Sequence, residues 1–213
     1  MTIAVIDYGM GNLHSVAKAL EHVTHEHVVV TRDPRRIQGA TRVVLPGQGA
    51  IRDCMGELER TELRGVVLEL IANQSKPLLG VCVGQQMLLE HSEENDGIEC
   101  LNFMPGKVRR FADNLRDASG ERLKVPHMGW NRVVQRHAHP LWEGIEDGAR
   151  FYFVHSYYVD AADDSSVFGT TEYGGVHAHV AVGRGSVFAV QFHPEKSAGD
   201  GLRLLENFVN WAP

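Results

Sequence analysis

The sequence is poor in cysteine and has no long apolar run. Its three cysteines, Cys54, Cys82 and Cys100, are odd in number and far apart, which excludes the disulfide framework of a small secreted domain. At least one thiol must therefore be free, and we expect a reducing, cytoplasmic environment. No apolar stretch approaches the roughly 18 residues that a membrane-spanning helix needs, so we expect no membrane partner.

An excess of positive charge is also missing. The chain carries 21 lysines and arginines against 27 aspartates and glutamates, a net charge of -6, which argues against a nucleic-acid partner held by bulk attraction. Residues 1–7 contain no basic leader, so no signal peptide is expected. No composition break, repeat or low-complexity tract divides the chain. We therefore expect a single domain over residues 1–213.

The first half of the chain alternates short apolar runs with segments of helical periodicity. The apolar runs predict strands buried on both faces, at residues 3–6, 27–31, 42–45 and 76–81. Helices are predicted after Asn12, which can cap the first of them, over residues 63–71, and from residue 85 to 89. This alternation implies right-handed crossovers and a mostly parallel central sheet flanked by helices.

The second half is dominated by extended segments. We predict them at residues 106–111, 123–125, 131–134, 151–159, 167–171, 176–182 and 186–192. A helix with Leu202, Leu205 and Phe208 on one face closes the chain. The predicted fold class is therefore α/β, with an antiparallel extension of the parallel sheet.

The strongest local motif is Gly80-Val81-Cys82-Val83-Gly84, between a predicted buried strand and a helix. It has the spacing of the nucleophile elbow G-x-S-x-G, with a thiol in place of the hydroxyl. Side chains at positions 80 and 84 would clash in such a sharp turn. The turn exposes Cys82 at a helix N-terminus and presents the backbone N–H of Val83 to a developing oxyanion. The alternative for this motif alone is a buried cysteine at the end of a strand.

A second motif, Gln191-Phe192-His193-Pro194-Glu195, follows the last apolar strand. His193 and Glu195 are two residues apart on an extended segment, so both side chains can project to the same side. A carboxylate beside an imidazole fixes its tautomer and leaves the other ring nitrogen free for a thiol. Cys82, His193 and Glu195 together therefore predict a nucleophile, a general acid-base and an orienting group.

The segment Leu45-Pro46-Gly47-Gln48-Gly49-Ala50 is a third candidate for the site. It also lies between a predicted strand and a helix, and its glycines allow backbone N–H groups to point into the cleft at the carboxyl ends of the strands. One of these groups could be a second oxyanion donor. A simple turn explains the segment equally well when it is taken alone.

The elbow with Gln85-Gln86, and the His193-Pro194-Glu195 motif, resemble the triad (class I) glutamine amidotransferases over nearly the whole chain. Further segments are similar to the glutaminase subunits of imidazole glycerol phosphate synthases; these are residues 7–13, 126–131, 153–158 and 193–197. The resemblance implies a flavodoxin-like fold, one type 1 glutamine amidotransferase domain over residues 1–213, and neither a cofactor nor a metal.

The same resemblance implies roles for individual residues. Cys82 would attack the side-chain amide of glutamine, with the oxyanion held by the N–H groups of Val83 and of the Gly47–Gln48 segment. His193, oriented by Glu195, would protonate the leaving ammonia and then activate water. The residues that match the family's glutamine-binding positions are Gln86, Glu94, Ser156 and Tyr157.

The resemblance also implies a partner. In this family the ammonia passes to a (β/α)₈-barrel synthase subunit in a heterodimer, which forms imidazole glycerol phosphate and aminoimidazole carboxamide ribonucleotide in histidine biosynthesis. Four residues match positions that face this partner: Asn12, Trp130, Tyr152 and Lys196. Trp130 is equally well explained as a buried core anchor. Gln48 stands where the family commonly has a small or aliphatic residue.

Other interpretations remain open at this point. Histidines gather in three places that suggest a metal site, namely His22, His25 and His27, His137 and His139, and His177 and His179. No carboxylate or thiol accompanies these groups at ligand spacing, which favours ordinary surface and strand residues. A non-catalytic protein on the same fold is disfavoured by the intact Cys82, His193 and Glu195. Another triad amidotransferase, of the anthranilate or aminodeoxychorismate type, is disfavoured by residues 126–131 and 155–158.

Overall fold

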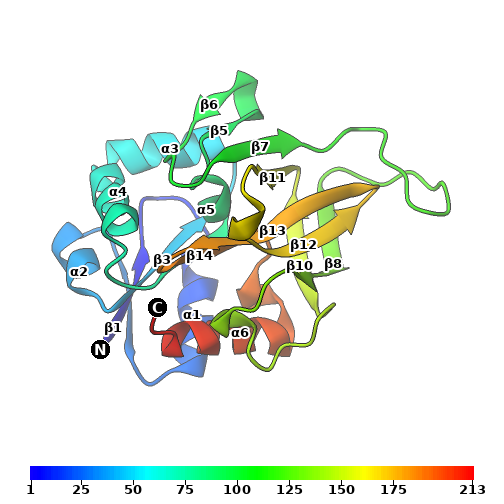
Figure 1. Ribbon diagram of the computed structural model, residues 1–213. Coiled ribbons are helices and arrows are strands. Elements are labelled where there is room, and N and C mark those ends of the chain that lie inside the picture. Colours follow the sequence, from blue (N-terminus) through cyan, green and yellow to red (C-terminus); the bar gives the residue numbers. More distant parts are fainter.

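A parallel sheet forms the centre of the computed structural model, which describes all 213 residues (Figure 1). Its strands are arranged in the order β2-β1-β3-β4-β14. Their bounds are Thr2–Ile6 (β1), His27–Thr31 (β2), Arg42–Gly47 (β3), Leu78–Cys82 (β4) and Val187–Val190 (β14). Numbered among the parallel strands alone, this is the order 2-1-3-4-5 of flavodoxin-like folds.

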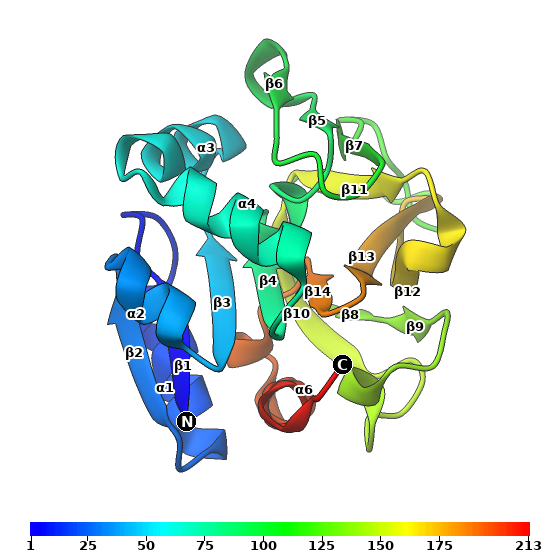
Figure 2. The same cartoon turned by 60° about the vertical axis from the view of Figure 1, so that its left-hand side comes forward.

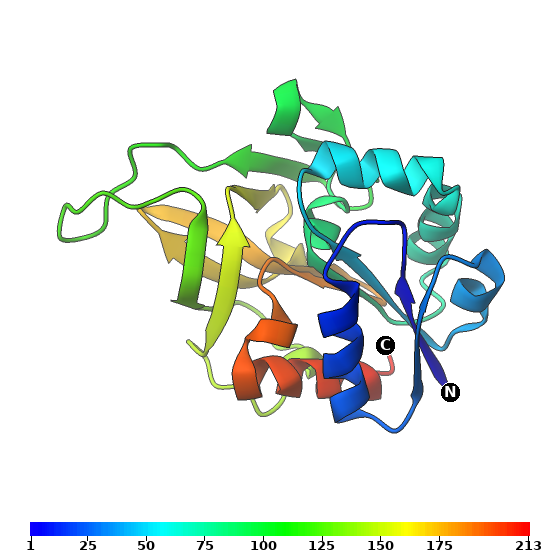
Figure 3. The same cartoon turned by 180° about the vertical axis from the view of Figure 1, so that it is seen from behind.

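Helices cover both faces of the sheet, as Figures 2 and 3 show. One face carries α1 (Leu13–Val23) and α6 (Ala198–Asn210), which pack against each other. The other face carries α2 (Pro34–Gly39), α3 (Ile51–Arg60) and α4 (Leu63–Asn73). The strands between them are apolar on both sides because both sides are covered, and they belong to one core cluster of 61 buried residues.

Beyond β14 the sheet continues in antiparallel fashion through β13, β11 and β7. The strands of this extension are β7 (Gly106–Arg110), β11 (Tyr157–Ala161), β12 (Val167–Tyr173), β13 (Val176–Arg184) and the short β5 (His91–Ser92), β6 (Ile98–Glu99) and β9 (Val134–Gln135). A separate two-stranded sheet pairs β8 (His127–Arg132) with β10 (Arg150–His155). None of the helices combines the length and the apolar character needed to cross a membrane.

Several predicted elements differ from the structure. Residues 123–125 form no strand; they belong to the long loop that reaches outward after β7 in Figure 1, where the only pairing is a single bridge between Arg116 and Arg122. The predicted strand 151–159 is interrupted at Ser156, and its halves, β10 and β11, pair in different sheets. Residues 131–134 are likewise divided between β8 and β9.

The helix predicted from residue 85 is only one turn, α5 (Val83–Gln86). It ends there because the carbonyls of the next residues turn to another segment: Met87 accepts from the N–H of Leu101, and Leu88 accepts from Phe103. Asn12 stands at the N-cap position of α1 but its side chain makes no capping bond. Its amide donates instead to a carboxylate oxygen of Glu195, at 3.4 Å.

Candidate active site

The turn from β4 into α5 places Cys82 at the carboxyl edge of the sheet. Cys82 has φ 57° and ψ -116°, a backbone conformation that residues other than glycine rarely adopt. The glycines around it are required by close packing, as predicted: a Cβ on Gly84 would lie 2.0 Å from the carbonyl oxygen of Leu45, and one on Gly80 would lie 2.9 Å from the Cβ of Ala189. The strained turn projects the thiol into a pocket, as a nucleophile elbow does.

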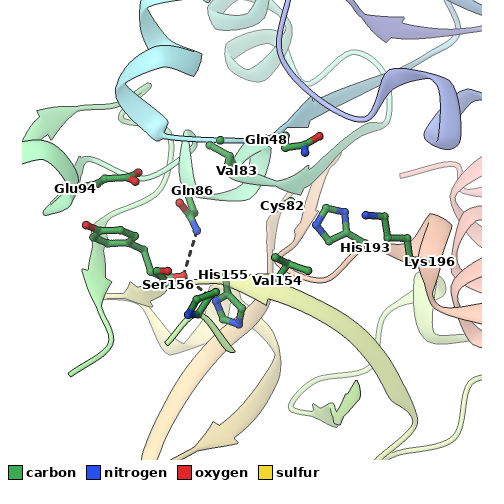
Figure 4. A pocket seen from close by; sticks show the side chains of 13 residues that line it. Gln48, Cys82, Val83, Gln86, Glu94, Val154, His155, Ser156, His193 and Lys196 are labelled. Carbon is green, nitrogen blue, oxygen red and sulfur yellow. Dashed lines mark hydrogen bonds between the residues drawn. The ribbon is translucent and has the colours of Figure 1, made fainter. Parts of the chain in front are cut away.

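His193 and Glu195 lie just beyond the end of β14, the strand next to β4. The Nδ1 of His193 is 2.8 Å from Oε1 of Glu195, whose side chain is fully buried. Because a carboxylate only accepts, Nδ1 carries the hydrogen, and Nε2 is left for Cys82, beside which the ring lies in Figure 4. Burial alone would lower the pKa of His193, but the hydrogen bonds with Cys82 and Glu195 outweigh it and raise that pKa to about 10.

The pocket around Cys82 has a volume of about 370 Å³ (Figure 4). Most of the predicted catalytic and glutamine-binding residues meet in it. Its lining is Gln48, Gly49, Cys82, Val83, Gln86, Glu94, Pro126, Val154, His155, Ser156, Tyr157, His193 and Lys196. Glu195 lies behind His193, and Gly47 lies beneath the elbow, where a Cβ would come within 2.7 Å of the backbone nitrogen of Gly84.

Gln86 forms one wall of the pocket through two hydrogen bonds from its amide nitrogen. It donates to the backbone carbonyl of Tyr157 at 3.2 Å and to Oε1 of Gln191 at 2.8 Å. Both hydrogens of the amide are thereby used, which leaves the carbonyl oxygen of Gln86 as an acceptor. Gln86 can therefore receive an N–H donor from a bound molecule.

Glu94 also lines the pocket and is fixed in place. Its Oε2 accepts the backbone N–H of Ile51, at the start of α3, at 2.8 Å. Burial raises the pKa of the nearby Tyr157 hydroxyl, and the Glu94 charge raises it further. Oε1 of Glu94 makes no bond of its own, so this carboxylate is a candidate to hold a cationic group.

The end of β3 and the loop after it are each held by a hydrogen bond from a buried side chain. The hydroxyl of Tyr8 donates to the carbonyl of Pro46 at 2.7 Å, and the thiol of Cys54 donates to the carbonyl of Gln48 at 3.4 Å. Gly49 has φ +89°, a conformation that favours glycine. Burial raises the pKa of the Cys54 thiol, as suits its structural role as a donor.

The residues predicted to face a partner are divided between two places. Lys196 lines the pocket, and Asn12 contacts Glu195 behind it. Trp130 and Tyr152 face each other across the β8–β10 sheet, with ring centroids 6.0 Å apart. Trp130 is 44% exposed, so its interpretation as a core anchor is wrong, and Met128 on the same strand is 62% exposed.

Two buried histidines that the sequence did not single out connect this sheet to the pocket. His155 donates from Nδ1 to the carbonyl of Tyr157 at 2.8 Å, so its Nε2 must accept from Nδ1 of His127, at 2.9 Å. The Nε2 of His127 in turn faces the amide nitrogen of Asn131 at 3.4 Å. Burial lowers the pKa of His127 to about 4; burial and the neighbouring His127 lower that of His155 to about 3.

Two further histidines of the groups considered for a metal site, His139 and His179, have local partners. The Nδ1 of His139 accepts the backbone N–H of Leu141, and that of His179 accepts the backbone N–H of Ala161. Nowhere do three or more histidine, cysteine, aspartate or glutamate side chains come together as a group that could hold a metal ion.

Comparison with known proteins finds relatives over the whole length. The family model described as "Glutamine amidotransferase class-I" matches residues 4–211. Imidazole glycerol phosphate synthase subunit HisH 1 of Pseudomonas aeruginosa is 59% identical over 210 residues, which cover 99% of this chain and 97% of that protein. Subunit HisH of Dechloromonas aromatica is 59% identical over 214 residues, with 100% and 97% covered.

Among solved structures, one titled "Structure of PurLQS from Thermotoga maritima" covers 98% of this chain and 97% of its own, with a TM-score of 0.71 at 20% identity. A second, titled "Crystal structure of glutamine amidotransferase", has a TM-score of 0.70 at 19% identity and covers 98% and 97%. At these identities the likeness concerns the fold alone. The α/β fold class predicted from the sequence is confirmed.

Proposed function

The chain belongs to the class-I glutamine amidotransferase family, and from this premise we propose that it is the glutaminase of an imidazole glycerol phosphate synthase. The resemblance stated from the sequence motifs is thereby confirmed at the level of the family and of its named relatives. The observation that carries the proposed chemistry is the pocket in which Cys82 lies beside His193, with Glu195 hydrogen-bonded to the far side of the imidazole at 2.8 Å.

The reaction begins with Cys82. Its sulfur attacks the side-chain carbonyl carbon of glutamine, and the carbonyl oxygen becomes an oxyanion that accepts from the backbone N–H of Val83 and from one in the Gly47–Gln48 segment. His193 gives its proton to the departing nitrogen, which leaves as ammonia, and a γ-glutamyl thioester remains on Cys82. A water molecule then attacks the thioester while His193 takes its proton, the bond between carbon and sulfur breaks, and glutamate is released as Cys82 is regenerated.

The state of His193 suits the first of these steps. Its raised pKa keeps the ring in the imidazolium form near neutral pH, so the proton that the leaving group needs is already on the ring. Glu195 stabilises this imidazolium and keeps the ring in one orientation. The buried carboxylate does not itself need to accept a proton during the reaction.

Glutamine is held by groups of complementary charge. We assign its α-ammonium to the carboxylate of Glu94, and an N–H donor of the substrate to the free carbonyl oxygen of Gln86. We assign the substrate's carboxylate to polar groups of Ser156 and Tyr157, which line the same pocket. Gln48, the departure from the family pattern, keeps its backbone N–H, so the oxyanion role of this segment is retained.

The product ammonia is used by a partner. We propose that a (β/α)₈-barrel synthase subunit binds over the face that carries Trp130 and Tyr152, with Asn12 and Lys196 toward it. An exposed tryptophan beside an exposed Met128 is typical of the apolar centre of a protein interface. The assembled enzyme would operate in the cytoplasm, where three free thiols stay reduced.

The test is a glutaminase assay on the purified chain, with and without the barrel subunit and its nucleotide substrate. We expect Cys82→Ala to abolish glutamate release, whereas synthesis driven by added ammonia persists in the complex. Cys100→Ala is the matched control, because Cys100 is also buried but does not line the pocket. Glutamate release by Cys82→Ala at the wild-type rate would contradict the nucleophile assignment, and full activity of the isolated chain would contradict the coupling to a partner.

A further inference from the structure

Gln191, two residues before His193, is a polar side chain that the reaction described above does not use. It follows β14 directly, its backbone N–H donates to the carbonyl of Val180 at 2.9 Å, and the whole residue is buried. Its amide nitrogen is 3.8 Å from the sulfur of Cys82, and its amide oxygen is 2.8 Å from the amide nitrogen of Gln86. Gln191 thus lies between the nucleophile and the wall that binds glutamine.

The orientation of this amide follows from its neighbours. The Tyr157 carbonyl can only accept, so the end of Gln86 that faces it must be the nitrogen. That nitrogen also faces Gln191, which must therefore present its oxygen to Gln86 and its nitrogen to Cys82. The two side chains form a directed chain in which every step has one donor and one acceptor, and the last donor points at sulfur.

A donor at this point acts differently on the two forms of the nucleophile. An N–H group that faces sulfur favours the thiolate over the thiol, because a hydrogen bond to a charged acceptor is stronger. The other titratable groups near Cys82 are His193 and Glu195 after β14, Tyr8 after β1, Cys54 on α3, and four that line the same pocket, namely Glu94, His155, Tyr157 and Lys196. Gln191 adds a donor that carries no charge, so it does not compete with His193 for a proton.

We propose that Gln191 is a further residue of the catalytic machinery: its amide donates to the sulfur of Cys82, stabilises the thiolate, and links it through Gln86 to the glutamine-binding wall. This inference rests on the proposed role of Cys82 as nucleophile. It gives the buried Gln191 a chemical role in addition to its packing in the core.

The test measures how the reactivity of the Cys82 thiol depends on pH, in the absence of glutamine. Iodoacetamide alkylates the full-length chain over a range of pH, and the rate at the Cys82 peptide is followed by mass spectrometry. Gln191→Glu has nearly the same shape but places a carboxylate oxygen against the sulfur, while its other oxygen still accepts from Gln86. We expect the pH midpoint of alkylation to rise by about one unit or more, and the rate near pH 7 to fall by up to about tenfold for each unit of that rise.

Gln191→Met supplies a second variant, which removes the donor without adding a charge and should shift the midpoint in the same direction by a smaller amount. Gln85→Met is the matched control: Gln85 is also buried, but its amide donates to the carbonyl of His179, away from the sulfur, so the profile should not move. Thermal unfolding checks that each variant is folded. If Gln191→Glu does not fold, the alkylation profile of Gln191→Met alone tests the proposal.

Unchanged alkylation profiles in the folded Gln191 variants would overturn the proposal, even if their glutaminase activity falls, because a structural role alone would then explain the loss. Failure of the proposed function has a different signature, since Cys82→Ala would then still release glutamate. A smaller midpoint shift in Gln191→Met than in Gln191→Glu, with both chains folded, is the result that supports the donor assignment.

Discussion

The pair of buried histidines, His127 and His155, should make the stability of this chain depend on pH. Both have a pKa lowered by burial, to about 4 and about 3, whereas in the unfolded chain they titrate near 6.5. As the pH falls below 6.5, the unfolded state takes up protons that the folded state refuses, so the free energy of unfolding decreases. The contribution of the two histidines to stability is fully present at a pH above 6.5, the pKa in the unfolded chain. It is lost as the pH falls toward 4 and 3, their pKa values in the folded chain.

The size of the effect follows from the two pKa values of each ring. Between pH 7 and pH 5 the loss is about 2 kcal/mol for each histidine, or about 4 kcal/mol for the pair. This is a large part of the 5–15 kcal/mol, roughly, that stabilises a typical domain. Protonation would also place a donor of His127 against the amide nitrogen of Asn131, and this conflict adds to the penalty.

Urea unfolding of the wild type and of His127→Gln/His155→Gln at several pH values tests this reasoning. The double variant should lose about 4 kcal/mol less than the wild type between pH 7 and pH 5, whatever its stability at pH 7. His177→Gln is the control, because the His177 side chain is exposed on β13 and should leave the slope as it is. Equal losses in the wild type and the double variant would refute the argument.

Three further outcomes are expected. Gly84→Ala should destabilise the fold by about 3 kcal/mol or more in chemical denaturation, because its Cβ would meet a backbone oxygen at 2.0 Å. Gly56→Ala is the control: Gly56 lies on α3 with open space around it, and the change should stabilise the fold by roughly 0.5–1 kcal/mol. Trp130→Ala should change the stability of the isolated chain by less than about 1.5 kcal/mol but weaken binding of the barrel subunit, as calorimetry can measure. Peptide mapping after brief iodoacetamide treatment should find Cys82 modified and Cys100 unmodified, because burial raises the pKa of Cys100 to about 12.

The parallel half of the fold could be predicted because its strands are continuous apolar runs. Helices cover both faces of this sheet, so side chains that point to either face are buried. The helix α2 was missed. Asp33 followed by Pro34 is a capping signal that marks the start of α2, and the Asp33 side chain indeed accepts from Arg35. The break at Ser156 could not be predicted, because two strands of equal character join there and only their partners in space differ.

The candidate site was predictable where a motif fixes geometry within a few residues. The Cys82 elbow and the His193–Glu195 pair are of this kind, since sharp turns and two-residue spacing determine their neighbours. Gln191 and His155 were not predictable, because a buried polar residue takes its meaning from partners far away in sequence, such as Gln86 at 105 residues. Asn12 was assigned to a helix cap by its position, but in space it reaches Glu195.

The interruption at Ser156 gives the molecule a joint. The strand β10 belongs to the small sheet that carries Trp130 and Tyr152, and β11 belongs to the main sheet, so a rotation between the two sheets changes the backbone at Ser156, which lines the pocket. The backbone N–H of His193 is bonded to the carbonyl of Tyr152 at 2.9 Å, on the far side of this joint. A partner that binds and displaces the small sheet therefore also displaces the backbone that carries the His193 imidazole.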